Sequence, residues 1–249
     1  MSKAAWIRIA LLVGAIGLLE VACRIGWVPP TMVIAPSHMV SAMVGLLASG
    51  TLGADIAQTF SSVGIAIVIS IVGGFTIGFW LHWFPPLRRA FDPFLAAYYA
   101  IPHFAFYPLL IVIFGLGSLP LIVLATLFAM VAMIVATLAG LDRVPRVLLK
   151  TARVHRLSPF EEMWRIRLPA AAPHLFSGIK LAVAYSFIGV IGAELIMSRT
   201  GLGYEIGFAY NNFDNAVMYP LIVFVLAVAA TVNTMFFLWE RKILARRRK

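Results

Sequence analysis

The sequence predicts an all-α membrane protein, a single polytopic helical bundle over residues 1–249 with about six transmembrane helices and a short cytoplasmic helix pair. Three observations support this fold class. Hydrophobic residues make up 62% of the chain and charged residues only 12%, whereas soluble domains are about half apolar and about a quarter charged. A chain of 249 residues has room for about six spans of about 20 residues each. The basic residues lie between and after the apolar runs.

The apolar runs define the expected spans. They cover residues 6–27, 58–84, 93–114, 119–141, 175–197 and 218–239. In the first span, Glu20 and Arg24 stand on one helix face, and their pairing offsets a cost of about 2.5–3.5 kcal/mol for either charge alone at mid-membrane. The segment that follows, which Ser37 is expected to cap, is predicted to lie along the outer surface, because a further span there would invert every later loop.

Glycine and proline positions indicate how the later spans pack. Gly74 and Gly78 in the second span allow another helix to approach closely. Pro102 and Pro108 are expected to break the third span and leave a kink, because each removes a backbone donor. Lys180 lies near the inner end of the fifth span, where its long side chain reaches the membrane interface.

The distribution of basic residues predicts the orientation. Seventeen of them fall on one side of the expected topology, and Arg199 is the clear outer exception. The seventeen are Lys3, Arg8, Arg88, Arg89, seven within residues 142–173 and six at the C-terminal end. Because basic residues flank spans on the cytoplasmic side, both termini are predicted to be cytoplasmic. No small-residue cleavage site follows the first apolar run, so we expect that run to remain as a span.

The sequence argues against an enzyme and against metal binding. The P-loop pattern G-x-x-x-x-G-K-[ST] does not occur, nor does H-E-x-x-H. The only cysteine, Cys23, has no partner for an internal disulfide, and no Cys/His cluster has metal-ligand spacing. The net charge of +10 lies at the ends of apolar runs, so it indicates membrane topology and a protein partner and not nucleic acid. We expect no catalytic residue, no metal and no cofactor bound by this chain.

Residues 142–173 form the longest polar interval and predict a helix pair. Between Arg143 and Arg167 there are seven basic residues, and residues 142–173 contain only three acidic ones. Pro145 suits the first turn of one helix. Ser158, with Glu161 three residues later, predicts a capping box at the start of a second helix. This second helix is expected to end near Leu168, Pro169 and Pro173.

The spacing within this interval is similar to the "EAA" loop of binding-protein-dependent ABC importer permeases, E-A-A-x3-G-x9-I-x-L-P. The matching positions are Lys150, Thr151, Ala152, Arg156, Ile166, Leu168 and Pro169. Three of them depart from the family pattern: Lys150 replaces Glu, Thr151 replaces Ala, and Arg156 replaces the turn glycine. A turn with positive φ disfavours a side chain, so the Ser158 helix start is expected to set the turn instead.

Shorter stretches resemble the nitrate/taurine/sulfonate class of these permeases. They are Ala35-Pro36-Ser37, Asp92-Pro93, Gly178-Ile179-Lys180-Leu181-Ala182, Ala193-Glu194-Leu195-Ile196 and Gly201-Leu202-Gly203. Together with the loop they cover nearly the whole chain in order. The resemblance implies small anions such as sulfonates, taurine or nitrate, or a heterocyclic vitamin precursor, as solutes.

The resemblance also implies the partners and the location. It implies a bacterial inner membrane, a second permease copy as a homodimer, a periplasmic or lipid-tethered solute-binding protein, and cytoplasmic ATPase subunits that bind ATP and Mg²⁺. Residues 142–173 would be the coupling loop that contacts the ATPase. The implied contact residues are Lys150, Thr151, Ala152, Arg153, Arg156, Leu157, Ser158, Ile166, Leu168 and Pro169. The simpler alternative is a basic loop that only sets topology.

Polar side chains within the expected spans are candidates for a solute path, because they are costly against lipid. The candidates are Tyr99, His103, Ser186 and Glu194. Ordinary helix contacts are the alternative for Tyr99 and Ser186, and a structural hydrogen bond for Glu194. His103 beside Pro102 is expected to satisfy a freed carbonyl. A secondary transporter or channel remains the alternative function, although the first and last three spans show no evident repeat.

Overall fold

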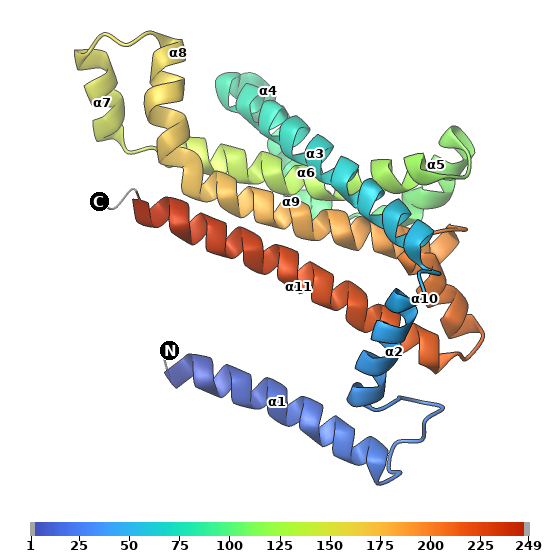
Figure 1. Ribbon diagram of the computed structural model, residues 1–249. Helices are drawn as coiled ribbons and strands as arrows, with labels where there is room; N and C mark the ends of the chain where they lie inside the picture. Colours follow the sequence, from blue (N-terminus) through green and yellow to red (C-terminus); the bar gives the residue numbers. More distant parts are fainter. Residues whose placement is uncertain (1–2, 247–249) are drawn as a thin grey trace. The chain divides into compact units, whose positions relative to one another are not determined.

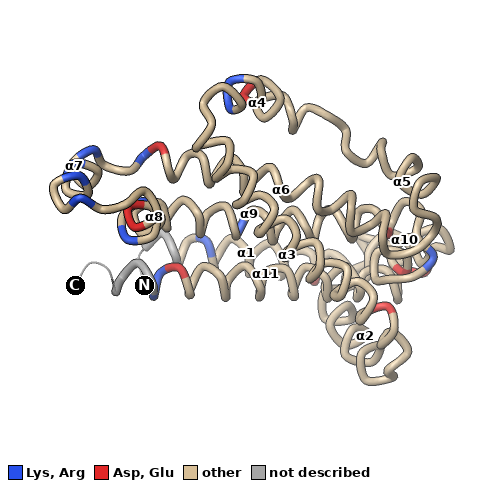
Figure 2. The backbone as a smooth tube through the Cα atoms, turned by 90° about the horizontal axis from the view of Figure 1, so that it is seen from above, with Lys and Arg blue, Asp and Glu red and all other residues tan. Residues whose placement is uncertain are grey.

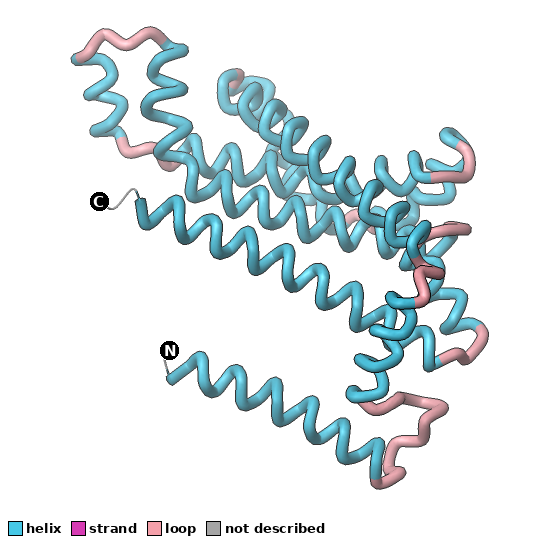
Figure 3. The backbone as a smooth tube through the Cα atoms, viewed as in Figure 1, coloured by secondary structure: helices cyan, strands magenta, loops and turns pink. Residues whose placement is uncertain are grey.

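The computed structural model describes residues 3–246, and every regular element in that range is a helix (Figure 1 and Figure 3). Five helices of the described range are long and apolar enough to cross a membrane, and a bent helix pair adds a sixth span if it is counted as one. The all-α bundle predicted from composition is thereby confirmed. Arg247, Arg248 and Lys249, which enter the orientation count, lie outside the described residues.

The elements are named in chain order. They are α1 (Lys3–Arg24), α2 (Pro36–Ala48), α3 (Gly53–Trp83), α4 (Pro85–Ala97), η1 (Tyr98–Ala100), η2 (His103–Phe106), α5 (Tyr107–Phe114), α6 (Ser118–Asp142), α7 (Arg146–Val154), α8 (Pro159–Glu162), η3 (Met163–Arg167), α9 (Leu168–Met197), α10 (Leu202–Asn211) and α11 (Asn215–Arg246). Of these, η1 and η2 are 3₁₀ turns and η3 is a π-helical turn. The chain divides into two compact units, one of Met1–Thr59 with Glu194–Val228 and one of Phe60–Ala193 with Ala229–Lys249.

In the first unit, the Glu20 carboxylate joins α1 to the start of α2. Arg24 Nε donates to Glu20 Oε1 at 2.6 Å, so the predicted pair is present. The same carboxylate accepts the Ser37 backbone N–H at 2.9 Å and the Ser37 hydroxyl at 2.7 Å. The expectation that Ser37 caps this helix was wrong, because α2 begins at Pro36 and its N-cap residue is Ala35. A distant carboxylate supplies the acceptor that the first turn needs.

In the second unit, α3 packs closely along α6 through its glycines. A Cβ added at Gly74 would lie 2.7 Å from the Met130 carbonyl oxygen, and one added at Gly78 would lie 2.8 Å from Thr137 Cβ. Buried residues recur along the whole length of α6. The close approach predicted for the second span is confirmed, and α6 is the helix it meets.

The third span is broken at Pro102, as expected, but Pro108 lies in the first turn of α5 and interrupts no helix. Pro85–Ala100 and His103–Phe114 meet at an angle of 94°. Ile101, with φ −78° and ψ 128°, is extended at the break, as the residue before a proline prefers to be. Pro102 has no N–H with which to continue the helix. The expected single run over residues 93–114 therefore consists of two helical arms, and the first arm begins earlier, at Pro85.

Many charged residues of the second unit lie on α4, α7 and α8. Figure 2 shows Lys and Arg along α7, with both signs of charge at α8 and at α4. The long helix α6 between these segments carries one charged residue, Asp142, at its last position. This polar end of the unit contains the interval that the sequence singled out.

Candidate functional site

Residues 142–173 begin with a helical hairpin in which α7 is followed by α8 (Figure 1). Pro145 is the N-cap residue of α7, with ψ 131°, and so lies one residue before the helical turn predicted for it. Ala152 is buried, at 1% exposure, whereas Val147 and Val154 are 71% and 80% exposed. One face of α7 therefore packs against the protein, and the opposite face is open.

The chain turns from α7 to α8 at Arg156, which has a φ of +51°. The Arg156 N–H donates to the Arg153 carbonyl, and the Leu157 N–H donates to the Ala152 carbonyl, both at 3.0 Å. These two bonds form a Schellman motif, with Arg156 at the position that is usually glycine. The turn is thus set at Arg156 itself, and the following helix start does not replace it as expected. A left-handed conformation costs a non-glycine residue about 1–2 kcal/mol.

The start of α8 is the capping box that the sequence predicted. The Ser158 hydroxyl accepts the Glu161 N–H at 3.3 Å, and Glu161 Oε2 accepts the Ser158 N–H at 3.0 Å. Pro159 occupies the first turn, where its missing N–H leaves no helical hydrogen bond unmade. Both ends of the connection between α7 and α8 are therefore held by local hydrogen bonds.

The second helix of the hairpin does not stop where the sequence predicted. Helical structure continues from Pro159 to Met197 through α8, η3 and α9, a run of 39 residues. The Leu168 N–H donates to the Met163 carbonyl, five residues back, which is the hydrogen bond of a π turn. This wider turn comes just before Pro169, whose ring and missing N–H would interrupt a regular α-helix. Pro173 is also accommodated within α9.

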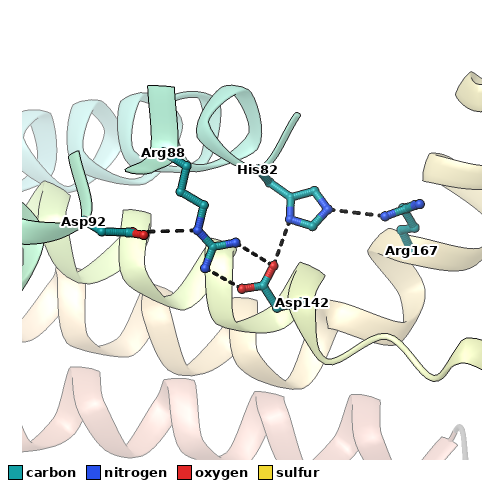
Figure 4. Close-up of polar contacts among 5 residues, drawn as sticks. All are labelled: His82, Arg88, Asp92, Asp142 and Arg167. Carbon is teal, nitrogen blue, oxygen red and sulfur yellow. Dashed lines mark hydrogen bonds and ion pairs between the residues drawn. The ribbon is translucent and has the colours of Figure 1, made fainter. Parts of the chain in front are cut away.

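A polar network holds the base of the hairpin (Figure 4). Asp142, the last residue of α6, accepts hydrogen bonds from Arg88 Nη1 at 2.8 Å and Nη2 at 2.6 Å. His82 Nδ1 lies 3.0 Å from Asp142 Oδ1, and His82 Nε2 lies 3.3 Å from Arg167 Nη1. Arg167 Nε also donates to Glu162 Oε1 at 2.7 Å. The network thus connects α3, α4 and α6 to the π turn.

The partners of His82 determine its protonation. An arginine side chain only donates hydrogen bonds and an ionised carboxylate only accepts them. His82 therefore bridges Arg167 and Asp142 as a neutral imidazole with its proton on Nδ1. The His82 ring thereby links Arg167 in the π turn to Asp142 at the end of α6.

Sequence reasoning missed His82 and Asp92 as members of this network. Asp92 Oδ1 lies 3.7 Å from Arg88 Nε, and its spacing of four residues from Arg88 was a signal that could have found it. His82 is 60 residues from Asp142 and 85 from Arg167, so no local pattern connects these residues.

Two of the four solute-path candidates, Tyr99 and His103, lie at an aromatic cluster of the second unit. The Tyr99 ring centre is 5.7 Å from that of Tyr185, and the His103 ring centre is 5.2 Å from that of Phe128. Phe128 and Tyr185 are themselves 5.0 Å apart. Ser186 follows Tyr185 in the chain and is fully buried.

Two polar atoms of these candidates are unsatisfied. His103 Nε2 and Ser186 Oγ are buried and have no hydrogen-bond partner among the described residues. His103 makes a hydrogen bond to the backbone of Ile101, next to Pro102, in agreement with its expected role at the break. Buried polar atoms normally have partners, so these two atoms are exceptions to the usual pattern.

Glu194, the fourth candidate, belongs to the first unit and holds the start of α10. The backbone N–H groups of residues 201, 202 and 203 donate to Asp55 Oδ1, Thr59 Oγ1 and Glu194 Oε2 at 2.7, 2.8 and 3.0 Å. The Thr59 hydroxyl donates to the Glu194 carboxylate at 2.9 Å. Side chains thus satisfy three N–H groups that a helix start leaves open. The geometry favours the structural alternative for Glu194.

These features define a class of protein: a helical membrane protein with a polar hairpin joined to the ends of its spans and no P-loop motif in its sequence. Residues 66–249 match the family described as the binding-protein-dependent transport system inner membrane component. The chain belongs to this family and is a permease subunit of an ABC importer of the inner membrane.

Named relatives agree with this assignment. The chain is 27% identical over 223 residues to the taurine transport system permease protein TauC of Escherichia coli, covering 89% of this chain and 78% of TauC. It is 27% identical over 240 residues to the putative aliphatic sulfonates transport permease protein SsuC of Bacillus subtilis, covering 96% and 87%. Among solved structures, a chain of the inward-facing MetNI methionine ABC transporter has the same fold, with a TM-score of 0.66, 20% identity, and coverage of 76% of this chain and 94% of that one.

Proposed function

We propose that this permease imports a small anion by using ATP hydrolysis on separate ATPase subunits, which dock on residues 142–173. ATP and Mg²⁺ would be bound by the ATPase, since the chain has no P-loop sequence. Closure of the ATPase pair would displace the hairpin, and the attached spans would alternate between inward-open and outward-open states.

The observation that carries this proposal is the continuity of helix from the hairpin into the membrane. Because α8, η3 and α9 follow without a break over Pro159–Met197, a displacement of α8 is passed to α9 without a flexible joint. Through the polar network, the same displacement would also reach the neighbouring helices α3 and α4. Arg167 of the π turn contacts His82 of α3, and Asp142 contacts Arg88 of α4.

The proposed contact residues divide by exposure. Lys150, Thr151, Arg153, Arg156 and Ser158 are exposed and would touch the ATPase. Ala152, Leu157, Ile166, Leu168 and Pro169 are buried or half-buried and would instead hold the hairpin in shape. Within α7, this division follows from the packing of one helix face against the protein.

The proposed assembly contains two copies of this chain, two ATPase subunits and a solute-binding protein that is periplasmic or lipid-tethered. Both termini of the permease would lie in the cytoplasm, as the charge distribution predicts. The family description supports a binding protein as partner. The homodimer is the simplest arrangement that surrounds a central path with one type of chain.

The relatives and the aromatic cluster support the proposed solute class. Several relatives are named as permeases for taurine, nitrate or aliphatic sulfonates. In this chain, Tyr99, His103 and Ser186 would line the path and offer the unsatisfied His103 Nε2 and Ser186 Oγ to a passing solute. The Ser186 hydroxyl can donate a hydrogen bond to a small oxygen-rich anion, whereas the bare Nε2 of a neutral His103 can only accept one.

Uptake by proteoliposomes tests the proposal. The permease would be reconstituted with its partner ATPase and binding protein, and accumulation of labelled taurine, nitrate and an alkanesulfonate would be measured with internal ATP or ADP. We expect ATP-dependent uptake of one of these solutes. The same uptake without the ATPase would contradict the coupling scheme, and ATP-dependent uptake of none of the three would contradict the solute class.

A further inference from the structure

The positive charge of the hairpin is not evenly distributed. In the second half, Arg165 lies 3.6 Å from Glu161 and Arg167 lies 2.6 Å from Glu162, so both basic residues have acidic partners. In the first half, no ion pair within the described residues involves Arg146, Lys150, Arg153 or Arg156, although all four are exposed. The excess positive charge of the hairpin therefore lies on α7 and its turn (Figure 2).

The open face of α7 combines these charges with apolar contact area. Val147 and Val154 lie two turns apart on a helix, and Lys150 and Thr151 lie between them on the same face. Both valines are largely exposed, at 71% and 80%. Like charges at helical spacing repel one another, so a partner that supplies carboxylates relieves repulsion in addition to forming ion pairs.

We infer that α7 seats in a groove of the ATPase that is acidic at its rim and apolar at its floor, with Lys150 contacting a carboxylate. The inference rests on the proposed docking of an ATPase at this hairpin and adds the chemistry of the partner surface. Its basis is charge complementarity: α7 carries three basic residues and no acidic residue. Lys150 would therefore also select the partner, because an ATPase with a basic groove at this point would be repelled.

A membrane surface is the other partner to which a basic helix can bind, but the geometry favours a protein. Helices that lie in the interface present a wide apolar face rich in Trp, Phe and Leu. The apolar residues at the centre of α7 that are turned inward include Ala152 and Leu149, and the open face contributes mainly the two valines. In Figure 1 the hairpin extends beyond the adjoining end of α6. The exposed apolar area of α7, from these valines and the 39% exposed Leu148, is too small for insertion into lipid.

A zero-length crosslink tests the contact directly. A water-soluble carbodiimide joins a lysine amine to a carboxylate that touches it, and mass spectrometry of the purified permease–ATPase assembly would identify the joined peptides. We expect Lys150 to be linked to an Asp or Glu of the ATPase. Lys180 and Glu240, whose Nζ and Oε2 lie 2.5 Å apart, provide an internal pair that reports whether the reaction has worked.

A second experiment measures how charge reversal on α7 changes the affinity for the ATPase. Replacing Lys150 and Arg153 by Glu should weaken ATPase binding by about tenfold or more, since like charges then face each other. The matched control is Arg165→Gln, which removes a charge that is already compensated by Glu161 and should change binding less than about threefold. An unchanged size-exclusion elution volume and an unchanged melting temperature in detergent would show that each variant is folded.

The outcomes separate this inference from the proposed function. An ATPase that remains bound to the Lys150→Glu, Arg153→Glu variant with unchanged affinity would overturn the acidic groove and leave the docking scheme intact. An intact assembly without any ATPase on the hairpin would overturn both. If the same variant instead loses binding to phosphatidylglycerol vesicles while ATPase binding is unchanged, the partner of α7 is the lipid surface and the inference is wrong.

Discussion

Arg88 and Asp142 form a two-point ion pair across 54 residues of sequence, with Nη1–Oδ1 and Nη2–Oδ2 distances of 2.8 and 2.6 Å. This pair fixes the start of α4 to the last residue of α6. A bidentate arginine–carboxylate pair is stronger and more directional than a single contact. Both side chains remain about a third exposed, at 31% and 36%, so solvent screens much of the attraction.

Replacing Asp142 by Asn should lower stability by about 1 kcal/mol, because one of the two bonds from Arg88 is lost and the other keeps its charged donor but loses its charged acceptor. Thermal unfolding in detergent, followed by tryptophan fluorescence, measures this change. The matched control is Asp92→Asn, whose carboxylate lies 3.7 Å from Arg88 and should contribute less. An equal effect of both variants would mean that the two-point geometry has no special importance.

Replacing Arg156 by Gly should raise the stability of the hairpin by about 1 kcal/mol, because glycine adopts the φ of +51° without steric cost. Amide hydrogen exchange of the α7–α8 connection is a suitable measurement, since it reports local opening. Arg156→Ala removes the guanidinium and keeps the Cβ, so it should not slow exchange. Equal slowing in both variants would assign the effect to charge and not to backbone conformation.

Replacing Gly201 by Ala should destabilise the start of α10 by about 2 kcal/mol or more. The residue has a φ of +104°, and an added Cβ would collide with the Glu194 carboxylate. Limited proteolysis near α10 and thermal unfolding would measure the loss. Gly115→Ala is the control, since Gly115 also has positive φ, +79°, but nothing lies within 4 Å of the added Cβ. Similar losses at both positions would show that contact with Glu194 adds nothing.

Replacing Gly74 by Ala should cost about 1–3 kcal/mol, because its Cβ would lie 2.7 Å from the Met130 carbonyl oxygen and force α3 away from α6. Gly64→Ala, on the same helix with nothing within 4 Å of its Cβ, should instead be neutral or stabilise by about 0.5–1 kcal/mol. Thermal unfolding of the two variants side by side decides the matter. A tolerated alanine at Gly74 would contradict the tight contact between α3 and α6.

Features that depend on adjacent residues were predictable from the sequence. The Ser158–Glu161 capping box and the Glu20–Arg24 pair involve residues three or four apart, so helical geometry alone brings them together. The count of spans followed from apolar length, because the membrane sets the length of each span. The sequence also predicted that another helix approaches Gly74 closely, but it did not predict that this helix is α6.

The sequence did not show which prolines interrupt a helix and which are accommodated within one. Pro102 and Pro169 carry the same local signal, yet the chain breaks at the first and continues through a π turn at the second. The difference depends on what surrounds each proline. The network around His82 joins residues 60 and 85 apart, and such pairs are brought together by packing of the bundle and not by spacing.

The hydrogen bonds between Glu20 and Ser37 have a practical consequence for engineering the N-terminal helix. An unrelated anchor substituted for α1 would still insert in the bilayer, but it would leave the first turn of α2 without its acceptor. A chimera therefore needs a carboxylate at the depth of Glu20, and not hydrophobicity alone, to retain the native entry into α2.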